Sequence, residues 1–361
     1  MPRCAQLEEL IDIDARKICV IKPSAFGDVV QSLPILRALR TRFPRASISW
    51  IVNDYLAPLL QDHAGVDDVI RYKRQGKWGD TANLLSNLRR SQFDLVFDLQ
   101  GLLRTGIMTL ATGARWRIGL ENYREGAHRA YTHVLPDTGR EVPAHARYWR
   151  VAEAFGVGDC AREADIAIGD ADREWAGRQL VGLDRPIMAI NAGSRWDTKR
   201  WSIQSFSAVA RRAVAELDHS LVILGSPDER SLADILTSLV ASAGHSRRVV
   251  NLAGQTSLGQ LAAVLEYSDY LLTNDSGPMH LAAALQTPVV GIFTCTTPSR
   301  SGPPGDQHEL VTTNVSCHGS YKKRCPQWGD RYMCCMNELD TARVWGGIVR
   351  LLEKNRQLAV A

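Results

Sequence analysis

Residues 269–285, DYLLTNDSGPMHLAAAL, decide the fold class of this chain. The apolar run 269–273 has the length and composition of a buried strand, and the Ala- and Leu-rich end has those of a helix. The polar residues between them lead into Pro278, which favours the first turn of a helix. A strand that runs through a turn into a helix is the repeating unit of a parallel α/β sheet. The N–H groups at such a helix start lack intrahelical partners, so the segment also predicts a site for a phosphorylated ligand.

The same alternation of strand and helix recurs on both sides of this segment and predicts an α/β protein with two Rossmann-like, doubly wound domains. In such domains ligands bind at the carboxyl ends of the strands, and we expect the two domains to face each other across a cleft. The predicted strands are residues 17–22, 47–52, 69–72 and 94–98 in the first half, and 187–191, 220–224, 248–251, 269–273 and 288–293 in the second.

Helical and polar sequence at residues 143–185, which ends in Gly and Pro residues, separates the two groups of strands. We place the domain boundary there. The expected domains are residues 1–165 and 166–335, followed by a C-terminal helix in 336–361 that could pack back on the first domain.

The composition favours a soluble, cytoplasmic protein. The 361 residues are 45% hydrophobic, which suits two cores and argues against a disordered or fibrous chain. No run reaches the roughly 18 apolar residues of a spanning helix, and the N-terminus does not resemble a signal peptide. Residues 1–150 hold 22 Lys and Arg against 16 Asp and Glu. That excess could attract a phosphorylated glycan, an anionic lipid or nucleic acid, although most of these charges read as an ordinary solvated surface.

Three loops in the first half carry candidate side chains. Asp28 follows the first strand where a helix begins, and it could cap that helix or act as a general base. This loop lacks GxGxxG, so it does not support a dinucleotide site. Gln100 and Arg104 follow the fourth strand, and Lys73 and Arg74 follow the third. Either group could hold an anionic ligand, but each could also belong to a capped or solvated turn.

Two loops in the second half suit a nucleotide. Gly193 and Ser194 form a turn that permits close approach of phosphate, and Lys199 adds a positive charge. An acidic residue after the 220–224 strand, Asp228 or Glu229, could accept the hydroxyls of a ribose or stabilise a helix start. In residues 269–285, the carboxylate of Asp275 would be repelled by a bound phosphate. We therefore expect Asp275 to bind a hydroxyl or to cap the turn. His280 could contact the ligand or be structural.

Four of these elements together resemble glycosyltransferase family 9, the ADP-heptose:lipopolysaccharide heptosyltransferases. They are Gly27-Asp28, residues 98–102 (DLQGL), residues 199–201 (KRW) and residues 274–280 (NDSGPMH), and they occur in the family's order. The resemblance implies a GT-B fold whose first domain binds the acceptor and whose second binds a nucleotide sugar, such as ADP-heptose. It also implies an inverting enzyme that needs no metal and no cofactor.

Carried over by position, the resemblance makes Asp28 the catalytic base. It implies donor-binding residues at Gly193, Ser194, Lys199, Glu229, Asp275, Ser276, Gly277, Pro278, Met279 and His280. Acceptor-binding residues are expected at Lys73, Arg74, Gln100, Arg104 and Arg124. The expected acceptor is an acidic or lipid-linked glycan, with contact at the inner membrane surface and no nucleic acid.

Two other functions fit the same architecture. One is a nucleotide-sugar epimerase, and the other is a binding protein without catalysis. A cluster near the C-terminus, formed by Cys317, His318, Cys325, Cys334 and Cys335, could hold zinc or an iron–sulfur cluster. It contains no CxxC pair, and free thiols or a disulfide are the alternative.

Overall fold

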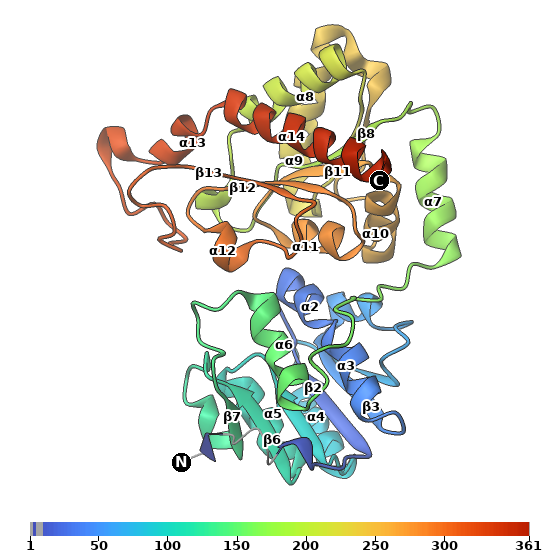
Figure 1. The fold of residues 1–361 in the computed structure, drawn as a ribbon, viewed down its shortest axis with the longest axis vertical. Helices are drawn as coiled ribbons and strands as arrows, with labels where there is room; N and C mark the ends of the chain where they lie inside the picture. The colour runs from blue at the N-terminus through green and yellow to red at the C-terminus, as the bar shows by residue number, and fades with distance from the viewer. Residues whose placement is uncertain (1–2, 5–9, 361) are drawn as a thin grey trace. The chain divides into compact units, whose positions relative to one another are not determined.

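The computed structural model describes residues 3–4 and 10–360, and it divides the chain into two compact units, Met1–Ala167 and Ile168–Ala361. Each unit contains one parallel sheet flanked by helices (Figure 1). The parallel α/β fold of two Rossmann-like units is therefore as predicted. No helix in the described part of the chain is long and apolar enough to cross a membrane.

Seven parallel strands form the sheet of unit 1, in the order β1-β7-β6-β5-β2-β3-β4. The central strands are buried on both faces, as expected for a parallel sheet that helices cover on each side. The strands are β1 (Arg3–Cys4), β2 (Lys17–Ile21), β3 (Ser47–Asn53), β4 (Asp68–Tyr72), β5 (Leu95–Asp98), β6 (Trp116–Leu120) and β7 (His133–Leu135).

The helices of unit 1 form two groups. Helices α2 (Phe26–Ser32), α3 (Ile35–Arg42) and α6 (Ala144–Ala154) pack together, and α4 (Trp78–Arg90), α5 (Leu103–Thr112) and η2 (Ala127–Ala130) form the second group. Neighbouring residues of β5 show that the groups cover opposite faces of the sheet. Val96 packs in the core that includes side chains of α4 and α5, whereas Phe97 stacks on Phe155, which follows α6, with ring centroids 5.5 Å apart. The remaining short helix is η1 (Asp54–Leu59).

Unit 2 has six parallel strands in the order β10-β9-β8-β11-β12-β13. They are β8 (Ile187–Asn191), β9 (Ser220–Ile223), β10 (Val249–Asn251), β11 (Tyr270–Asn274), β12 (Val289–Phe293) and β13 (Glu309–Thr312). The helices are α7 (Asp170–Leu180), α8 (Ile203–Leu217), α9 (Arg230–Val240), α10 (Leu258–Tyr267), α11 (Gly277–Ala284), α12 (Pro298–Ser301), α13 (Cys334–Glu338) and α14 (Thr341–Val360). The short helices are η3 (Asp197–Lys199), η4 (Pro227–Glu229), η5 (Ala241–His245), η6 (Ser246–Arg248) and η7 (Gly329–Arg331).

The last helix, α14, packs inside unit 2, against β12, β13 and α8. Val344, Ile348 and Leu351 recur on one face of the helix and are fully buried. Arg350 and Lys354 form ion pairs with Glu309 of β13. The segment thus belongs to the packed core of unit 2, and its expected association with the first domain stays a prediction.

All nine strands predicted from the sequence occur, with ends that differ by at most one residue. Four strands were not predicted: β1, β6, β7 and β13. β6 contains Arg117 and Gly119, and β7 has only three residues, so neither shows the apolar run typical of a buried strand.

Candidate functional site

The loops after β8 and β11, which are neighbouring strands, are joined by two buried asparagines. Asn191 donates from its side-chain amide to the carbonyl of Gly193 at 3.3 Å and to the hydroxyl of Ser276 at 3.2 Å. Asn274 donates to the carbonyl of Ala192 at 2.7 Å and accepts from the N–H of Trp201 at 3.0 Å. These bonds fix the two loops as one rigid edge, which is the location predicted for a ligand site in a parallel sheet.

Helix α11 starts at this edge. Its N-cap residue, Ser276, is extended, no side chain caps the helix, and Pro278 occupies the first turn. The amides of such a turn have no intrahelical acceptor, and they coincide with the positive end of the helix dipole. Ser276, Gly277 and Pro278 are half-buried, so a ligand can reach this backbone. The geometry suits an anion, as the sequence indicated.

Lys199 and Asp275 meet beside this helix start. The ammonium lies 2.7 Å from a carboxylate oxygen of Asp275, which is almost fully buried. The same ammonium lies 4.8 Å from the ring centroid of Trp196. Ser194, buried in the loop after β8, donates its hydroxyl to the backbone carbonyl of Asp275 at 3.4 Å. Lys199 therefore compensates the charge of Asp275, so this carboxylate can lie near an anion site.

Glu229 approaches the same loop from η4. A Cβ atom added at Gly193 would lie 2.1 Å from the carboxyl carbon of Glu229, so only glycine leaves room for this carboxylate. One carboxylate oxygen accepts the N–H of Ser226 at 2.9 Å. The neighbouring Asp228 is exposed to solvent. Of the two acidic residues that the sequence left open, Glu229 is the one beside the Gly193 turn.

Two residues of the predicted donor set are buried among packed side chains. Met279 is fully buried and its sulfur lies next to Gly291 of β12. His280 is buried near His308. Burial lowers the pKa of His308 to about 4, and the charges of His280 and Lys354 act in the same direction. The structure thus places Met279 and His280 where they support α11 from within the unit.

Asp28 lies in the first turn of α2, a position that is compatible with a helix cap and with a general base. One carboxylate oxygen accepts the N–H of Ala25 at 3.4 Å, so the side chain helps to cap the helix. The other accepts the hydroxyl of Tyr148 at 3.3 Å. The ammonium of Lys22 lies 3.8 Å away, and the carboxylate side chain is 39% exposed. Asp28 is therefore both held in place and open to solvent.

Lys22 and Tyr148 were not selected from the sequence. Lys22 is 2% exposed, and burial lowers its pKa while the charges of Asp28 and Asp98 oppose that shift. Its ammonium donates to the side-chain carbonyl of Gln100 at 3.3 Å and lies 5.3 Å from the ring centroid of Tyr148. Lys22 directly follows the apolar strand β2, and a lysine at that place in the sequence indicates a candidate site residue. Tyr148 sits on α6, far along the chain, and nothing local marks it.

The loop after β5 contains a buried residue, Asp98, and a partly exposed one, Gln100. Asp98 is fully buried, and it accepts the N–H groups of Gln100 and Gly101 at 2.9 and 3.0 Å and the hydroxyl of Tyr131 at 2.8 Å. Burial raises its pKa. These bonds make Asp98 the cap of a turn. Gln100 accepts from Lys22 and from the N–H of Ser24, so it links this turn to the Asp28 loop.

The basic residues expected to bind the acceptor do not form one cluster. Arg104 is half-buried at the start of α5, whereas Lys73, Arg74 and Arg124 are exposed. Arg124 is close enough to Lys22 to lower the pKa of that lysine, after the larger effect of burial. Lys73 and Arg74 follow β4 at the far edge of the sheet.

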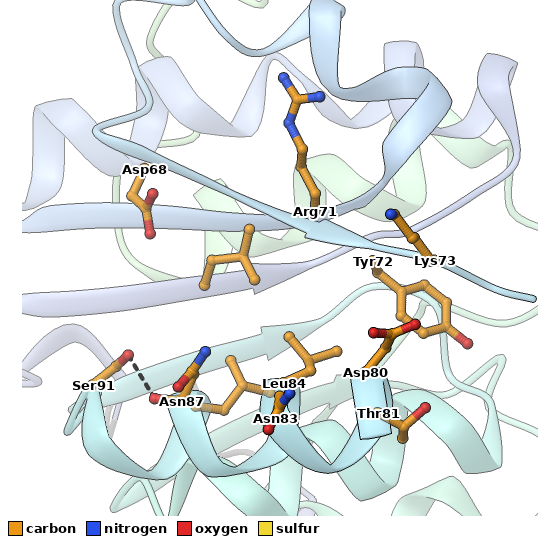
Figure 2. A pocket seen from close by; sticks show the side chains of 12 residues that line it. Asp68, Arg71, Tyr72, Lys73, Asp80, Thr81, Asn83, Leu84, Asn87 and Ser91 are labelled. Carbon is orange, nitrogen blue, oxygen red and sulfur yellow. Dashed lines mark hydrogen bonds between the residues drawn. The ribbon is translucent and has the colours of Figure 1, made fainter. Parts of the chain in front are cut away.

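Lys73 lines a pocket of about 450 Å³ between β4 and α4 (Figure 2). Ile70, Leu84 and Leu88 give it an apolar floor. Figure 2 shows polar side chains of α4 in a row along this groove, whereas Arg71 points away from the helix. The polar lining residues are Asp68, Arg71, Tyr72, Lys73, Asp80, Thr81, Asn83, Asn87 and Ser91.

The C-terminal cysteines lie near one another. Burial raises the pKa of Cys335 to about 12, and the thiols of Cys317, Cys334, Cys325 and Cys295 act in the same direction. Every cysteine whose side chain the structure describes is a free thiol. Over the same residues, no group of His, Cys, Asp or Glu side chains has the geometry to hold a metal ion.

Comparison with known proteins adds a family and a fold. The model of glycosyltransferase family 9 (heptosyltransferase) matches residues 81–329. The lipopolysaccharide core heptosyltransferase OpsX of Haemophilus influenzae is 27% identical over 82% of this chain and 84% of its own length. Lipopolysaccharide heptosyltransferase 1 of Pseudomonas aeruginosa is 26% identical over 86% of this chain and 87% of its own.

Two solved structures share the fold. A family 9 glycosyltransferase of Veillonella parvula superposes with a TM-score of 0.80 at 23% identity, over 96% of this chain and 99% of that one. The ADP-heptose lipopolysaccharide heptosyltransferase II of Escherichia coli gives 0.77 at 22%, over 94% and 99%.

Proposed function

Because the chain belongs to glycosyltransferase family 9, the heptosyltransferase family, and is therefore a glycosyltransferase, we propose that it transfers a heptose from ADP-heptose to the core of a lipopolysaccharide. The observation that carries the donor side is the Lys199–Asp275 ion pair at the start of α11. It brings an ammonium, the first amides of the helix and a carboxylate together in one place. A sugar diphosphate presents the matching groups, which are phosphate oxygens and hydroxyls.

In this proposal the second unit binds the donor. Lys199, Ser194 and the first amides of α11 contact the diphosphate, and Glu229 accepts hydroxyls of the ribose. Asp275 binds a sugar hydroxyl once Lys199 turns toward phosphate. As the bond from C1 to the diphosphate breaks, negative charge grows on the leaving group. Groups already positioned to receive that charge stabilise the transition state more than the ground state.

Asp28 is the proposed general base. It removes the proton from the acceptor hydroxyl whose oxygen attacks C1, which gives a single inverting displacement without a metal ion. The ammonium of Lys22 lies 3.8 Å from one carboxylate oxygen of Asp28 and helps to fix its position. The bond from Tyr148 fixes the direction of one carboxylate oxygen.

The acceptor side is proposed for unit 1, with Gln100, Arg104, Arg124, Lys73 and Arg74 as the residues that receive an acidic glycan. The pocket beside Lys73 supports one part of this assignment. Its amide and hydroxyl side chains, such as Asn83 and Asn87, match sugar hydroxyls, and its apolar floor matches the C–H face of a sugar ring. The acceptor is proposed to be lipid-linked and to be met at the cytoplasmic face of the inner membrane.

The test is an assay of purified full-length protein with ADP-heptose, with and without a heptose-free lipopolysaccharide core. We expect ADP release that requires the acceptor, a heptosylated product of inverted configuration, and no loss of rate with EDTA. A changed sugar formed from the donor alone would identify an epimerase instead. Binding of ADP-heptose without any product would identify a binding protein, and either result would overturn the proposal.

A further inference from the structure

Helix α5 presents a stripe of apolar side chains to solvent. Leu103, Ile107 and Leu110 are 53%, 45% and 52% exposed, and their spacing places them on one face of the helix. The opposite face, with Met108 and Thr109, is buried against the sheet. In the described part of unit 1, α5 is thus apolar on the side that faces away from the core as well as on the core side.

Exposed arginines lie near both ends of α5, together with Glu125, whose carboxylate accepts the N–H of Leu103 at 3.1 Å. Helix α4 packs along one side of α5, and the guanidinium of Arg89 lies against Gly113, where α5 ends. Arg90, next to Arg89 in the chain, is exposed. Arg115 lies two residues after Gly113, and its guanidinium is 5.2 Å from the ring centroid of Trp116. On the other side η2 packs against α5, and Arg129 of η2 and Arg124, which precedes it, are exposed. Residues 103–130 hold five arginines and two glutamates.

We propose that this face of α5 lies on the surface of an anionic phospholipid bilayer. Apolar side chains on an exposed helix face gain by entering the boundary between head groups and acyl chains, and arginines beside them meet lipid phosphates. Leu103, Ile107 and Leu110 would be the inserted residues, and Arg89, Arg90 and Arg115 the residues that contact head groups.

The charge around the stripe argues for lipid over a second copy of this chain. A two-fold contact through α5 would gather the exposed arginines of both copies at one interface, where like charges disfavour the pair. A nucleic acid would use the arginines but gain nothing from three exposed aliphatic side chains. An anionic bilayer offers acyl chains to the apolar stripe and phosphate groups to the arginines.

The surface is adjacent in the chain to the loop that contains Gln100, because α5 follows that loop directly. A bilayer held along α5 would therefore keep the candidate acceptor loop close to the membrane. Binding of this surface to a bilayer does not depend on which sugar is transferred or on whether transfer occurs.

The test is flotation of the full chain with vesicles of phosphatidylcholine alone and of phosphatidylcholine mixed with phosphatidylglycerol. We expect binding to the mixed vesicles that weakens as salt is raised. The triple variant Leu103→Ser, Ile107→Ser, Leu110→Ser should lose most of it, roughly tenfold or more. Arg89→Gln with Arg90→Gln should reduce it several-fold. The matched control is Val181→Ser with Ile235→Ser, which removes exposed apolar side chains from unit 2 and should change nothing.

Thermal unfolding of each variant checks that the fold is retained. Equal binding of the wild type and the triple variant, or no preference for anionic vesicles, would overturn the proposal. So would a wild-type dimer in solution that the triple variant dissociates, because the face would then be an interface between copies. Transfer to a water-soluble core fragment should be unaffected by the triple variant. A failure of transfer with flotation intact would count against the proposed reaction and leave the membrane surface standing.

Discussion

The ammonium of Lys199 lies 2.7 Å from the carboxylate of Asp275, which is buried at the carboxyl edge of the unit 2 sheet. The pair stands beside the first turn of α11, where anion binding is expected. A buried carboxylate needs a partner, and here the partner is the lysine that we propose to hold a phosphate. Binding of a diphosphate would therefore exchange one anionic partner of Lys199 for another, and would free Asp275 for a hydroxyl.

Lys199→Ala should weaken binding of ADP by roughly 10- to 100-fold, since a hydrogen bond to a charged group contributes about 1.5–3 kcal/mol. The measurement is titration calorimetry with ADP. Lys323→Ala is the matched control, because the Lys323 ammonium also lies over the ring of Trp196, at 5.8 Å, but forms no described ion pair with Asp275. Equal losses for the two variants would mean that general positive charge, and not the Lys199–Asp275 site, binds the diphosphate.

Asp28→Asn should lower kcat by about 10²- to 10⁴-fold, the usual contribution of a general base, while the affinity for ADP stays unchanged. Tyr148→Phe should have a smaller effect, because it removes one bond to the carboxylate and leaves the base present. Steady-state kinetics with saturating donor distinguish the two. Asp62→Asn, at an exposed position, serves as the control. Near-normal turnover by Asp28→Asn would exclude it as the base.

Gly193→Ala should displace the carboxylate of Glu229, because a Cβ there would lie 2.1 Å from its carboxyl carbon. We expect weaker binding of ADP and little change in the binding of pyrophosphate, which has no ribose. Glu229→Ala should give the same selectivity. The double variant should cost less than the sum of the two single losses, since both act on one contact. Additive losses would show that Gly193 acts through something other than Glu229.

The stability of the protein should fall between pH 6.5 and about pH 4, in part through His308. Burial lowers the pKa of this residue to about 4, so the folded protein keeps it neutral where the unfolded chain takes up a proton. Stability is therefore complete above pH 6.5 and declines as the pH drops, by about 3 kcal/mol at most for this group.

The variant His308→Gln should reduce the pH dependence of urea unfolding between pH 7 and pH 5. The remaining slope comes from other histidines whose pKa values burial also lowers, namely His63, His145 and His219. The effect of His308 is therefore the difference between wild type and variant in the slope of unfolding free energy against pH. An unchanged slope would show that His308 is protonated equally in the folded and unfolded states.

The sequence by itself determined the two parallel sheets and the turns at their carboxyl edges. Short apolar runs such as residues 187–191, set between helical segments, favour central strands of a parallel sheet, and Pro278 favours a helix start because its ring fixes φ. The four motifs that resemble family 9 are local in the chain, so the sequence alone shows them.

Contacts between distant parts of the chain were decided only by the tertiary structure. The Lys199–Asp275 pair, the approach of Tyr148 to Asp28 and the fit of Glu229 against Gly193 each join residues from separate elements. Spacing along the chain carries no record of such distances. Burial was also decided only by the fold: Met279 and His280 are buried within unit 2, and their contact with a ligand stays a prediction.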